Sequence, residues 1–91
     1  MAGEVINKEN QWLSKIAEGD EFAFRRLVDA YYNKLGTFVL GLTGSRQLTE
    51  ELVQDVFLKV WQHRDKLEAI ENFDAWLFIL TRNHTFNSLK Q

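Results

Sequence analysis

Proline is absent from all 91 residues of the chain, and only five glycines interrupt it. Proline is the residue that most strongly breaks a helix, and glycine weakens a helix interior by about 1 kcal/mol relative to alanine. Apolar residues recur at spacings of three and four, which is the period of an amphipathic helix. The sequence therefore predicts an all-α fold, and we expect a compact bundle of about four helices.

Helix boundaries are predicted from residues that can satisfy the free backbone groups at helix ends. Four polar side chains are suited to accept hydrogen bonds at helix starts, namely Asn7, Asp20, Ser45 and Asn72. The predicted helices run over about residues 8–18, 21–43, 46–62 and from 73 almost to the end. Gly19 and Gly44 stand where a left-handed residue commonly ends a helix. The polar stretch 63–71 lacks periodicity, so we expect a loop there.

The apolar positions also predict which helix faces are buried. In the second helix they fall at residues 24, 27, 28, 31, 35, 38, 39 and 42, which form one face. In the third helix a ridge of four residues is expected to enter the core, formed by Leu48, Leu52, Val56 and Val60. Gly36 and Gly41 lie inside the second helix, where each weakens it. Close crossing of another helix is the expected reason for these two glycines.

Several classes of protein are excluded by what the sequence lacks. Without cysteine there is neither a disulfide scaffold nor a cysteine zinc site. No stretch approaches the roughly 20 apolar residues of a membrane span, and no secretory signal is recognisable, so a cytoplasmic protein is expected. The length suits one domain over residues 8–91, after a loose leader over residues 1–7.

An enzymatic function is also disfavoured. His63 and His84 are far apart in the sequence, lack a partner motif, and are interpreted as isolated surface residues. The acidic residues of the third helix stand on an exposed face, which gives no reason for the shifted pKa values of an acid–base pair. No glycine-rich phosphate loop is present. We expect no catalysis, no cofactor, no metal site and no small-molecule substrate.

Two stretches do carry surface chemistry. Glu51, Gln54 and Asp55 share one stripe of the third helix, so they can meet a basic partner together. The fourth helix carries more apolar and aromatic surface than one core needs, followed by an Arg82–Asn83 pair. The plainer interpretation of its Trp76, Leu77 and Leu80 is that they are core residues. We expect the two surfaces on opposed sides of the bundle, as in an adaptor between a large protein and a nucleic acid.

Three stretches and the spacing between them resemble region 2 of bacterial extracytoplasmic-function (ECF) sigma factors. They are residues 21–35 (EFAFRRLVDAYYNKL), 49–61 (TEELVQDVFLKVW) and 73–83 (FDAWLFILTRN). The resemblance covers about residues 10–90. It implies a helical domain that binds the β′ subunit of the RNA polymerase core and that recognises and helps melt the −10 promoter element through the non-template strand. An anti-sigma factor is a further implied partner.

The resemblance also implies roles for particular residues. The positions that match the polymerase-binding helix are Glu51, Gln54, Asp55 and Leu58. The positions that match the DNA-binding elements are Arg64, Lys66, Phe73, Trp76, Arg82, Asn83 and Lys90. Phe73 and Trp76 are expected to stack on bases or to form pocket walls, and Asn83 is expected to read a base edge. The arginines and lysines are expected to contact phosphates.

The chain departs from the family pattern at three positions and in its extent. Asn87 stands where Asp is common, Lys90 where Arg is common, and Asn33 where Pro is frequent. Complete members carry a basic linker and a second helical domain for the −35 element, and we expect this chain to be an excised domain. The alternative function is a helical module that binds protein only, such as a decoy or an anti-sigma-binding domain.

Overall fold

The computed structural model describes residues 11–90, and every regular element in that range is a helix. The elements are a helical segment over residues 11–17, α2 (Glu21–Thr43), α3 (Arg46–Gln62), the 3-10 helix η1 (Arg64–Ala69) and α4 (Phe73–Leu89). The predicted all-α fold is confirmed. The predicted leader, residues 1–7, and the expected cap Asn7 lie outside the described range.

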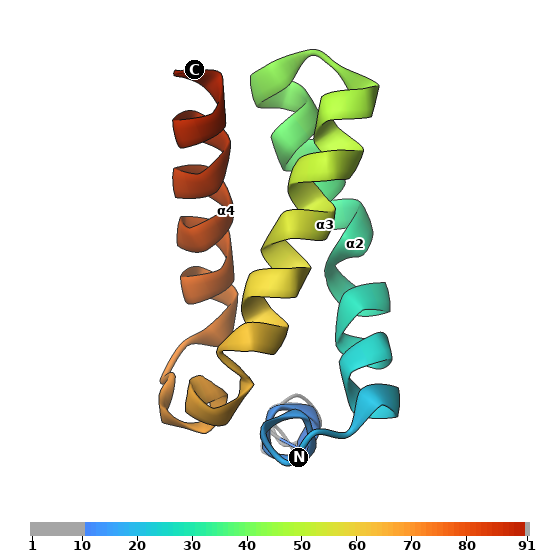
Figure 1. Cartoon of the computed structure of the whole chain (residues 1–91), viewed down its shortest axis with the longest axis vertical. Coiled ribbons are helices and arrows are strands. Elements are labelled where there is room, and N and C mark those ends of the chain that lie inside the picture. Colours follow the sequence, from blue (N-terminus) through green and yellow to red (C-terminus); the bar gives the residue numbers. More distant parts are fainter. Residues whose placement is uncertain (1–10, 91) are drawn as a thin grey trace, which may run out of the picture.

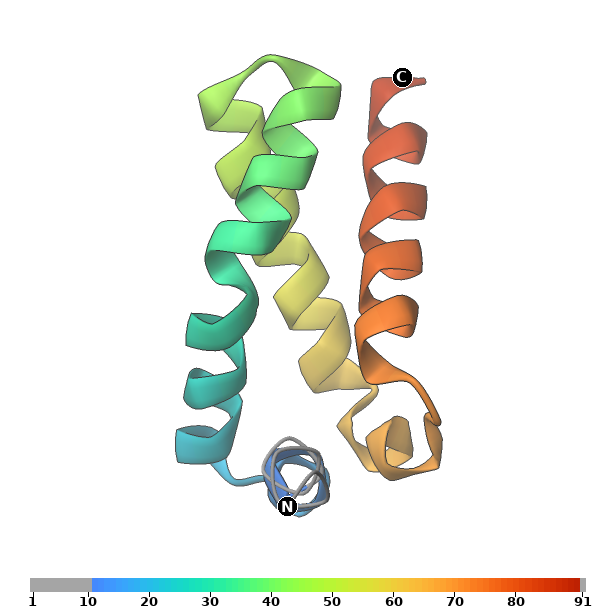
Figure 2. The same ribbon diagram turned by 180° about the vertical axis from the view of Figure 1, so that it is seen from behind.

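The three long helices pack side by side, and their connections lie at the two ends of the bundle. Figure 1 shows α2 rising, α3 descending and α4 rising again, with the segment 11–17 crossing beneath them. The view from behind, in Figure 2, shows α3 passing between α2 and the lower part of α4. Each of the three helices contacts the other two. The molecule extends over 41 × 27 × 21 Å.

The predicted helix boundaries follow from local hydrogen bonds. The Asp20 carboxylate accepts from the backbone N–H of Phe22 and Ala23, and Asn72 accepts from that of Ala75. The Ser45 hydroxyl oxygen accepts in the same way at the start of α3. These three hydrogen bonds confirm the predicted caps at the starts of α2, α3 and α4. Gly19, after the segment 11–17, and Gly44, after α2, adopt left-handed φ values of 95° and 69°, as predicted for residues that end a helix.

The core is formed by apolar side chains from every element. The fully buried ones are Ile16, Leu27, Leu35, Val39, Val53, Val56, Val60, Leu67 and Leu77. Leu52 is buried as well and Leu48 is half-buried, so the predicted ridge of α3 enters the core as expected. None of the helices described in residues 11–90 combines the length and apolar character that crossing a membrane requires.

Two structural expectations are wrong. A Cβ atom added at Gly36 or at Gly41 would meet nothing within 4 Å, so no helix crosses closely there. The stretch 63–71 is not an irregular loop, because residues 64–69 form η1. Leu67 from this short helix is fully buried and anchors the connection to the core. The apolar residues of this polar stretch are Leu67, Ala69 and Ile70, which are too few to establish a helical period, so the pattern did not reveal the short helix.

Candidate functional site

The predicted polymerase-binding residues of α3 point away from the core. Glu51, Gln54, Asp55 and Leu58 are all exposed, and the Leu58 side chain is unusually so for an apolar residue, at 55%. The opposite side of α3 carries the valines and leucines that are buried in the core, so these four side chains face outward. The structure therefore brings the four residues together on one accessible face.

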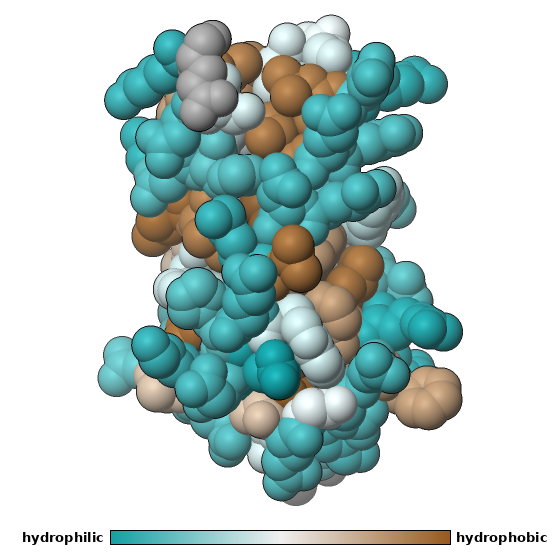
Figure 3. All heavy atoms as spheres, viewed as in Figure 1, coloured by the Kyte–Doolittle hydropathy of each residue, from teal (hydrophilic) through white to brown (hydrophobic). Residues whose placement is uncertain are grey.

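An apolar groove adjoins this face. It lies between α2 and α3, has a volume of about 600 Å³ and is lined mainly by Phe24, Val28, Tyr32, Phe57, Leu58 and Trp61. Gln54, Glu21 and Arg25 complete its lining. The rings of Phe24 and Trp61 pack with centroids 5.0 Å apart. Figure 3 shows apolar side chains interrupting the otherwise polar front of the bundle.

Sequence analysis did not identify this groove. Residues 24, 28 and 32 of α2 are four apart, so they share one face of that helix. That pattern could have drawn attention to an apolar stripe. It could not have distinguished a stripe covered by α3 from a stripe that is partly left open beside it.

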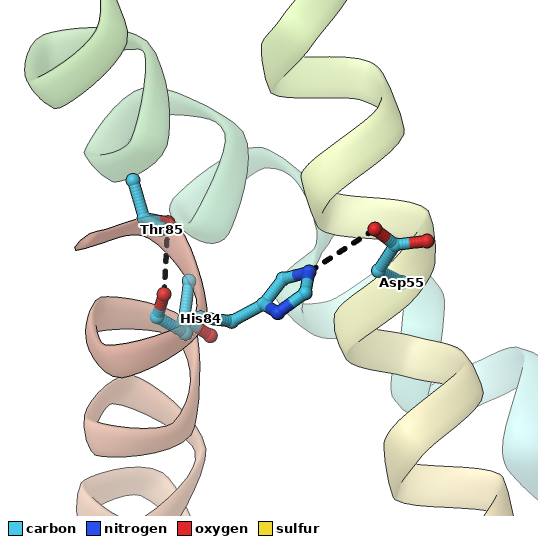
Figure 4. A network of polar contacts seen from close by, with 4 residues as sticks. Asp55, His84 and Thr85 are labelled. Atoms are coloured by element: carbon cyan, nitrogen blue, oxygen red, sulfur yellow. Dashed lines mark hydrogen bonds and ion pairs between the residues drawn. The ribbon is translucent and has the colours of Figure 1, made fainter. Parts of the chain in front are cut away.

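Asp55 is exposed, yet it is not free. His84 Nε2 lies 3.0 Å from Asp55 Oδ2, and the two residues are 29 positions apart in the chain. Figure 4 shows the imidazole of α4 reaching across to the carboxylate of α3. The histidine side chain is 23% exposed and that of Asp55 is 54% exposed. The interpretation of His84 as an isolated surface residue is therefore wrong, because it has a partner on the neighbouring helix.

This contact also corrects the expected arrangement of the two surfaces. Asp55 belongs to the predicted polymerase face, and His84 follows Asn83 of the predicted DNA face directly in the sequence. Because the two side chains are in hydrogen-bond contact, the faces adjoin each other along the α3–α4 boundary. They do not lie on opposed sides of the bundle.

The aromatic residues at the start of α4 are less accessible than expected. Phe73 is only 5% exposed, and its ring packs against Tyr31 and Trp76 with centroid distances of 5.7 Å to each. Burial of this ring leaves little surface on which a base could stack, so a pocket wall is the one of its two expected roles that stays a prediction. Trp76 is half-buried at the edge of the core, as is Leu80, while Leu77 is fully buried.

The second half of α4 presents the remaining predicted DNA-binding residues. Arg82, Asn83 and Lys90 are exposed and line one open hollow of about 520 Å³, together with Phe86, Asn87 and Leu89. The Arg82 guanidinium lies over the Phe86 ring, 5.2 Å from its centre. Phe86 is 40% exposed, and no binding role was expected for it. Phe86 lies four residues after Arg82, so the two share one face of the helix, and this spacing could have identified Phe86 from the sequence.

The two basic residues of η1 behave differently from each other. Arg64 Nη1 donates to the backbone oxygen of Trp61 at 3.0 Å, and its guanidinium carbon lies 4.6 Å from the centre of the Trp61 ring. Lys66 is exposed. Both residues precede α4, whereas Asn83 lies ten residues into that helix, about 15 Å along its axis. The predicted DNA-binding residues therefore form two groups at different heights of the bundle.

No metal-binding cluster occurs in the described part of the chain. Residues 11–90 contain no group of three or more histidine, aspartate or glutamate side chains placed to hold a metal ion. What the site offers is exposed carboxylates and an apolar groove on one face, and arginine, lysine, two amides and a phenyl ring on the adjoining one. Such groups suit binding to macromolecules.

Comparison with known proteins identifies the family. The family model for sigma-70 region 2 matches residues 27–91. The ECF RNA polymerase sigma factor SigW of Bacillus subtilis (strain 168) is 23% identical over 79 residues, which is 87% of this chain and 42% of that protein.

Two further relatives are more similar in sequence. The ECF RNA polymerase sigma factor SigL of Mycobacterium tuberculosis is 32% identical over 72 residues, covering 78% of this chain and 41% of that protein. The probable RNA polymerase sigma factor RfaY of Xanthomonas campestris pv. campestris is 32% identical over 71 residues, covering 78% of this chain and 18% of that protein. The chain thus spans less than half the length of each of these relatives. It belongs to the sigma-70 region 2 family, as a region 2 domain of the ECF sigma factor type.

Proposed function

We propose that this chain acts in transcription initiation, binding the RNA polymerase core through α3 and the −10 non-template strand of a promoter through α4. The observation that carries the proposal is the pair of adjoining exposed faces, one acidic and apolar, the other cationic and rich in amides. Sigma factors among its relatives make polymerase and promoter DNA the partners that fit these two chemistries.

The polymerase-binding part of the proposal rests on Glu51, Gln54, Asp55 and Leu58. A basic surface, such as the clamp helices of β′, could donate hydrogen bonds to the two carboxylates, each contributing roughly 1.5–3 kcal/mol. Leu58 and Gln54 also line the α2–α3 groove, so an apolar side chain of the partner could enter there. A few apolar anchors beside a charged rim are typical of protein interfaces.

The strand-binding part rests on the hollow at the end of α4. The Asn83 amide can donate and accept at a base edge, while Arg82 and Lys90 can contact phosphates. The accessible ring in this hollow is Phe86, so we assign to it the stacking role that the buried Phe73 cannot take. Lys66 of η1 is free to follow the backbone towards the other end of α4.

Energies limit what the domain does alone. Extruding a base costs a few kcal/mol, and stacking it on an aromatic side chain returns about 1–3 kcal/mol. The net charge of −2 adds little general attraction for phosphates. We therefore infer that stable strand binding requires polymerase to hold the domain and the DNA together. Nanomolar promoter binding by the isolated chain at physiological salt would contradict this inference.

The polymerase interface is tested by reversing charge on α3. Glu51→Lys is expected to weaken binding of the chain to core polymerase at least tenfold, measured by fluorescence anisotropy, since it replaces an attraction with a repulsion. Glu18→Lys changes an exposed carboxylate beyond this face and serves as the matched control. Equal loss for both variants would show a general charge effect and would refute the assignment.

The strand interface is tested separately. Single strands that bind the polymerase-bound chain are first selected from a random pool, because the promoter sequence is not known. Asn83→Ala should then alter or abolish the selected consensus, whereas Asn33→Ala, an exposed asparagine on α2, should leave it unchanged. A consensus unaffected by Asn83→Ala would show that this residue does not read a base.

The alternative is a module that binds protein only. The apolar groove and the acidic net charge favour it, because both suit a protein partner better than a nucleic acid. The same selection distinguishes the two functions. Polymerase binding that depends on Glu51, with no strand enriched above the level for polymerase alone, would support the alternative.

A further inference from the structure

Arg64 differs from the other basic residue of η1 because it is bound twice to one neighbouring residue. Its Nη1 donates to the backbone oxygen of Trp61 at 3.0 Å, and its guanidinium carbon lies 4.6 Å from the centre of the Trp61 ring. Arg64 is half-buried, whereas Lys66 is exposed. Trp61 therefore fixes where the guanidinium lies, through its backbone and its ring together.

The local sequence accounts for this arrangement. Trp61 belongs to the last turn of α3, where carbonyl groups lack the N–H partner that a longer helix would supply. Arg64 begins η1 three residues later, close enough for its long side chain to fold back to that carbonyl. The helix dipole also favours a cation at this end of a helix. His63 supports the same turn, with its Nδ1 atom 2.8 Å from the backbone oxygen of Lys59.

The Trp61 ring is also part of the apolar groove between α2 and α3. It lines that groove beside Phe57 and Leu58, and its centre lies 5.0 Å from that of the Phe24 ring. Phe24, Trp61 and Arg64 thus form one row of side chains from α2 across α3 to η1. Because Trp61 is only half-buried, the core restrains part of its ring, and the guanidinium restrains it further.

We propose that Arg64 is a positioning residue for polymerase binding, which holds the Trp61 ring in the wall of the α2–α3 groove. This inference rests on the function proposed above, and it replaces the expected contact of Arg64 with a phosphate. A ring that is already oriented reduces the side-chain entropy that binding of a partner must remove. Arg64 thus acts through Trp61 and contacts neither polymerase nor DNA, while Lys66 stays the phosphate contact of η1.

The first measurement asks whether Arg64 orients the ring in the free chain. The chain is labelled with fluorinated tryptophan, and the fluorine NMR resonance of Trp61 is assigned by its loss in Trp61→Leu. Arg64→Ala should move this resonance towards its position in the urea-unfolded chain, because the ring loses a fixed neighbour. A resonance that stays in place overturns the proposal.

A matched control for this measurement is Lys34→Ala. Lys34 Nζ lies 5.6 Å from the centre of the Tyr31 ring, so a cation over an aromatic ring is removed here too. Neither of these two residues lines the α2–α3 groove that contains Trp61. Lys34→Ala should therefore leave both the Trp61 resonance and the affinity for polymerase unchanged.

The second measurement asks whether the role of Arg64 depends on Trp61. Affinity for core polymerase is measured by fluorescence anisotropy for the unsubstituted chain, Arg64→Ala, Trp61→Leu and the double variant. Arg64→Ala should weaken binding about fivefold, because polymerase must then immobilise a ring that Arg64 otherwise holds. In the Trp61→Leu background the same substitution should have no further effect. A further fivefold loss in that background would show that Arg64 contacts polymerase directly, and would overturn the proposal.

The third measurement separates positioning from phosphate binding. For a selected single strand bound to the complex of polymerase and chain, Arg64→Ala should leave the slope of log affinity against log salt unchanged. Loss of a phosphate contact would instead lower its magnitude by about 0.7, and that result overturns the proposal. Arg64→Met keeps the aliphatic stem and loses only the guanidinium, so it is measured in parallel and should behave like Arg64→Ala. Circular dichroism melts show that each variant is folded.

These outcomes also distinguish this inference from the proposed function. If core polymerase fails to bind the unsubstituted chain, the proposed function is refuted and the role of Arg64 fails with it. If polymerase binds the unsubstituted chain and Arg64→Ala equally well, only the role of Arg64 is refuted.

Discussion

The two glycines inside α2 permit a prediction in which structure and simple expectation disagree. Glycine is unfavourable within a helix, and close packing against a neighbour is the usual reason to retain it. At Gly36 and Gly41 an added Cβ meets no atom within 4 Å. Alanine can therefore be introduced at either position without displacing any neighbour, and neither glycine requires a left-handed backbone.

The magnitude follows from helix propensity alone. Replacing glycine by alanine in a helix interior is favourable by about 1 kcal/mol, partly because the unfolded chain loses conformational freedom. We expect Gly36→Ala and Gly41→Ala each to raise the free energy of unfolding by about that amount. In a domain of this size each substitution should raise the melting temperature by about 4–8 °C. The matched control is Gly44→Ala, which should destabilise by roughly 1–2 kcal/mol because φ is 69° there.

The assay is urea unfolding of the three variants, followed by circular dichroism, with polymerase binding measured on the same preparations. Destabilisation by Gly36→Ala would refute the reasoning, since it would require a contact that the structure lacks. Gly36 lines a hollow of about 300 Å³ between α2 and the start of α3. A more stable Gly36→Ala chain with weaker polymerase binding would show that the glycine leaves room for a partner.

Three further predictions concern single side chains. Leu67→Ala should lower the free energy of unfolding by about 2–5 kcal/mol in urea, because the leucine is fully buried in η1, and a negligible change would show that η1 is not anchored by it. Asn72→Ala removes the acceptor for the backbone N–H of Ala75 and should cost about 1 kcal/mol in the same assay, whereas equal stability would show that this cap is dispensable. Arg82→Ala should reduce the slope of log affinity against log salt for single-strand binding by about 0.7, and an unchanged slope would argue against a phosphate contact.

Much of the fold was predictable because its signals are local. Asp20, Ser45 and Asn72 cap helices through atoms two or three residues away, so the sequence around each cap contains the whole interaction. The left-handed conformation of Gly44 was predictable for the same reason, because it depends on the glycine itself and on the helix end that it follows. The exposed stripe of α3 was predictable from the buried ridge opposite it, since 3.6 residues per turn relate the two.

The errors all concern partners that are distant in the sequence. The burial of Leu67 and of the Phe73 ring depends on what the other helices place above them, which the spacing of three between residues 67, 70 and 73 does not report. The partner of His84 lies on another helix, 29 residues earlier. Whether another helix approaches Gly36 is likewise decided by how α2 packs against the rest of the chain.

By itself, then, the sequence determined the three long helices, their ends and the side of each that faces inward, because these depend on backbone hydrogen bonds and apolar spacing within a few residues. The tertiary structure alone decided which ring stays accessible, where α2 and α3 leave a groove open, and that the two candidate faces meet at Asp55 and His84. The physical reason is that packing angles and contacts between helices arise from many weak interactions summed over residues far apart in the chain.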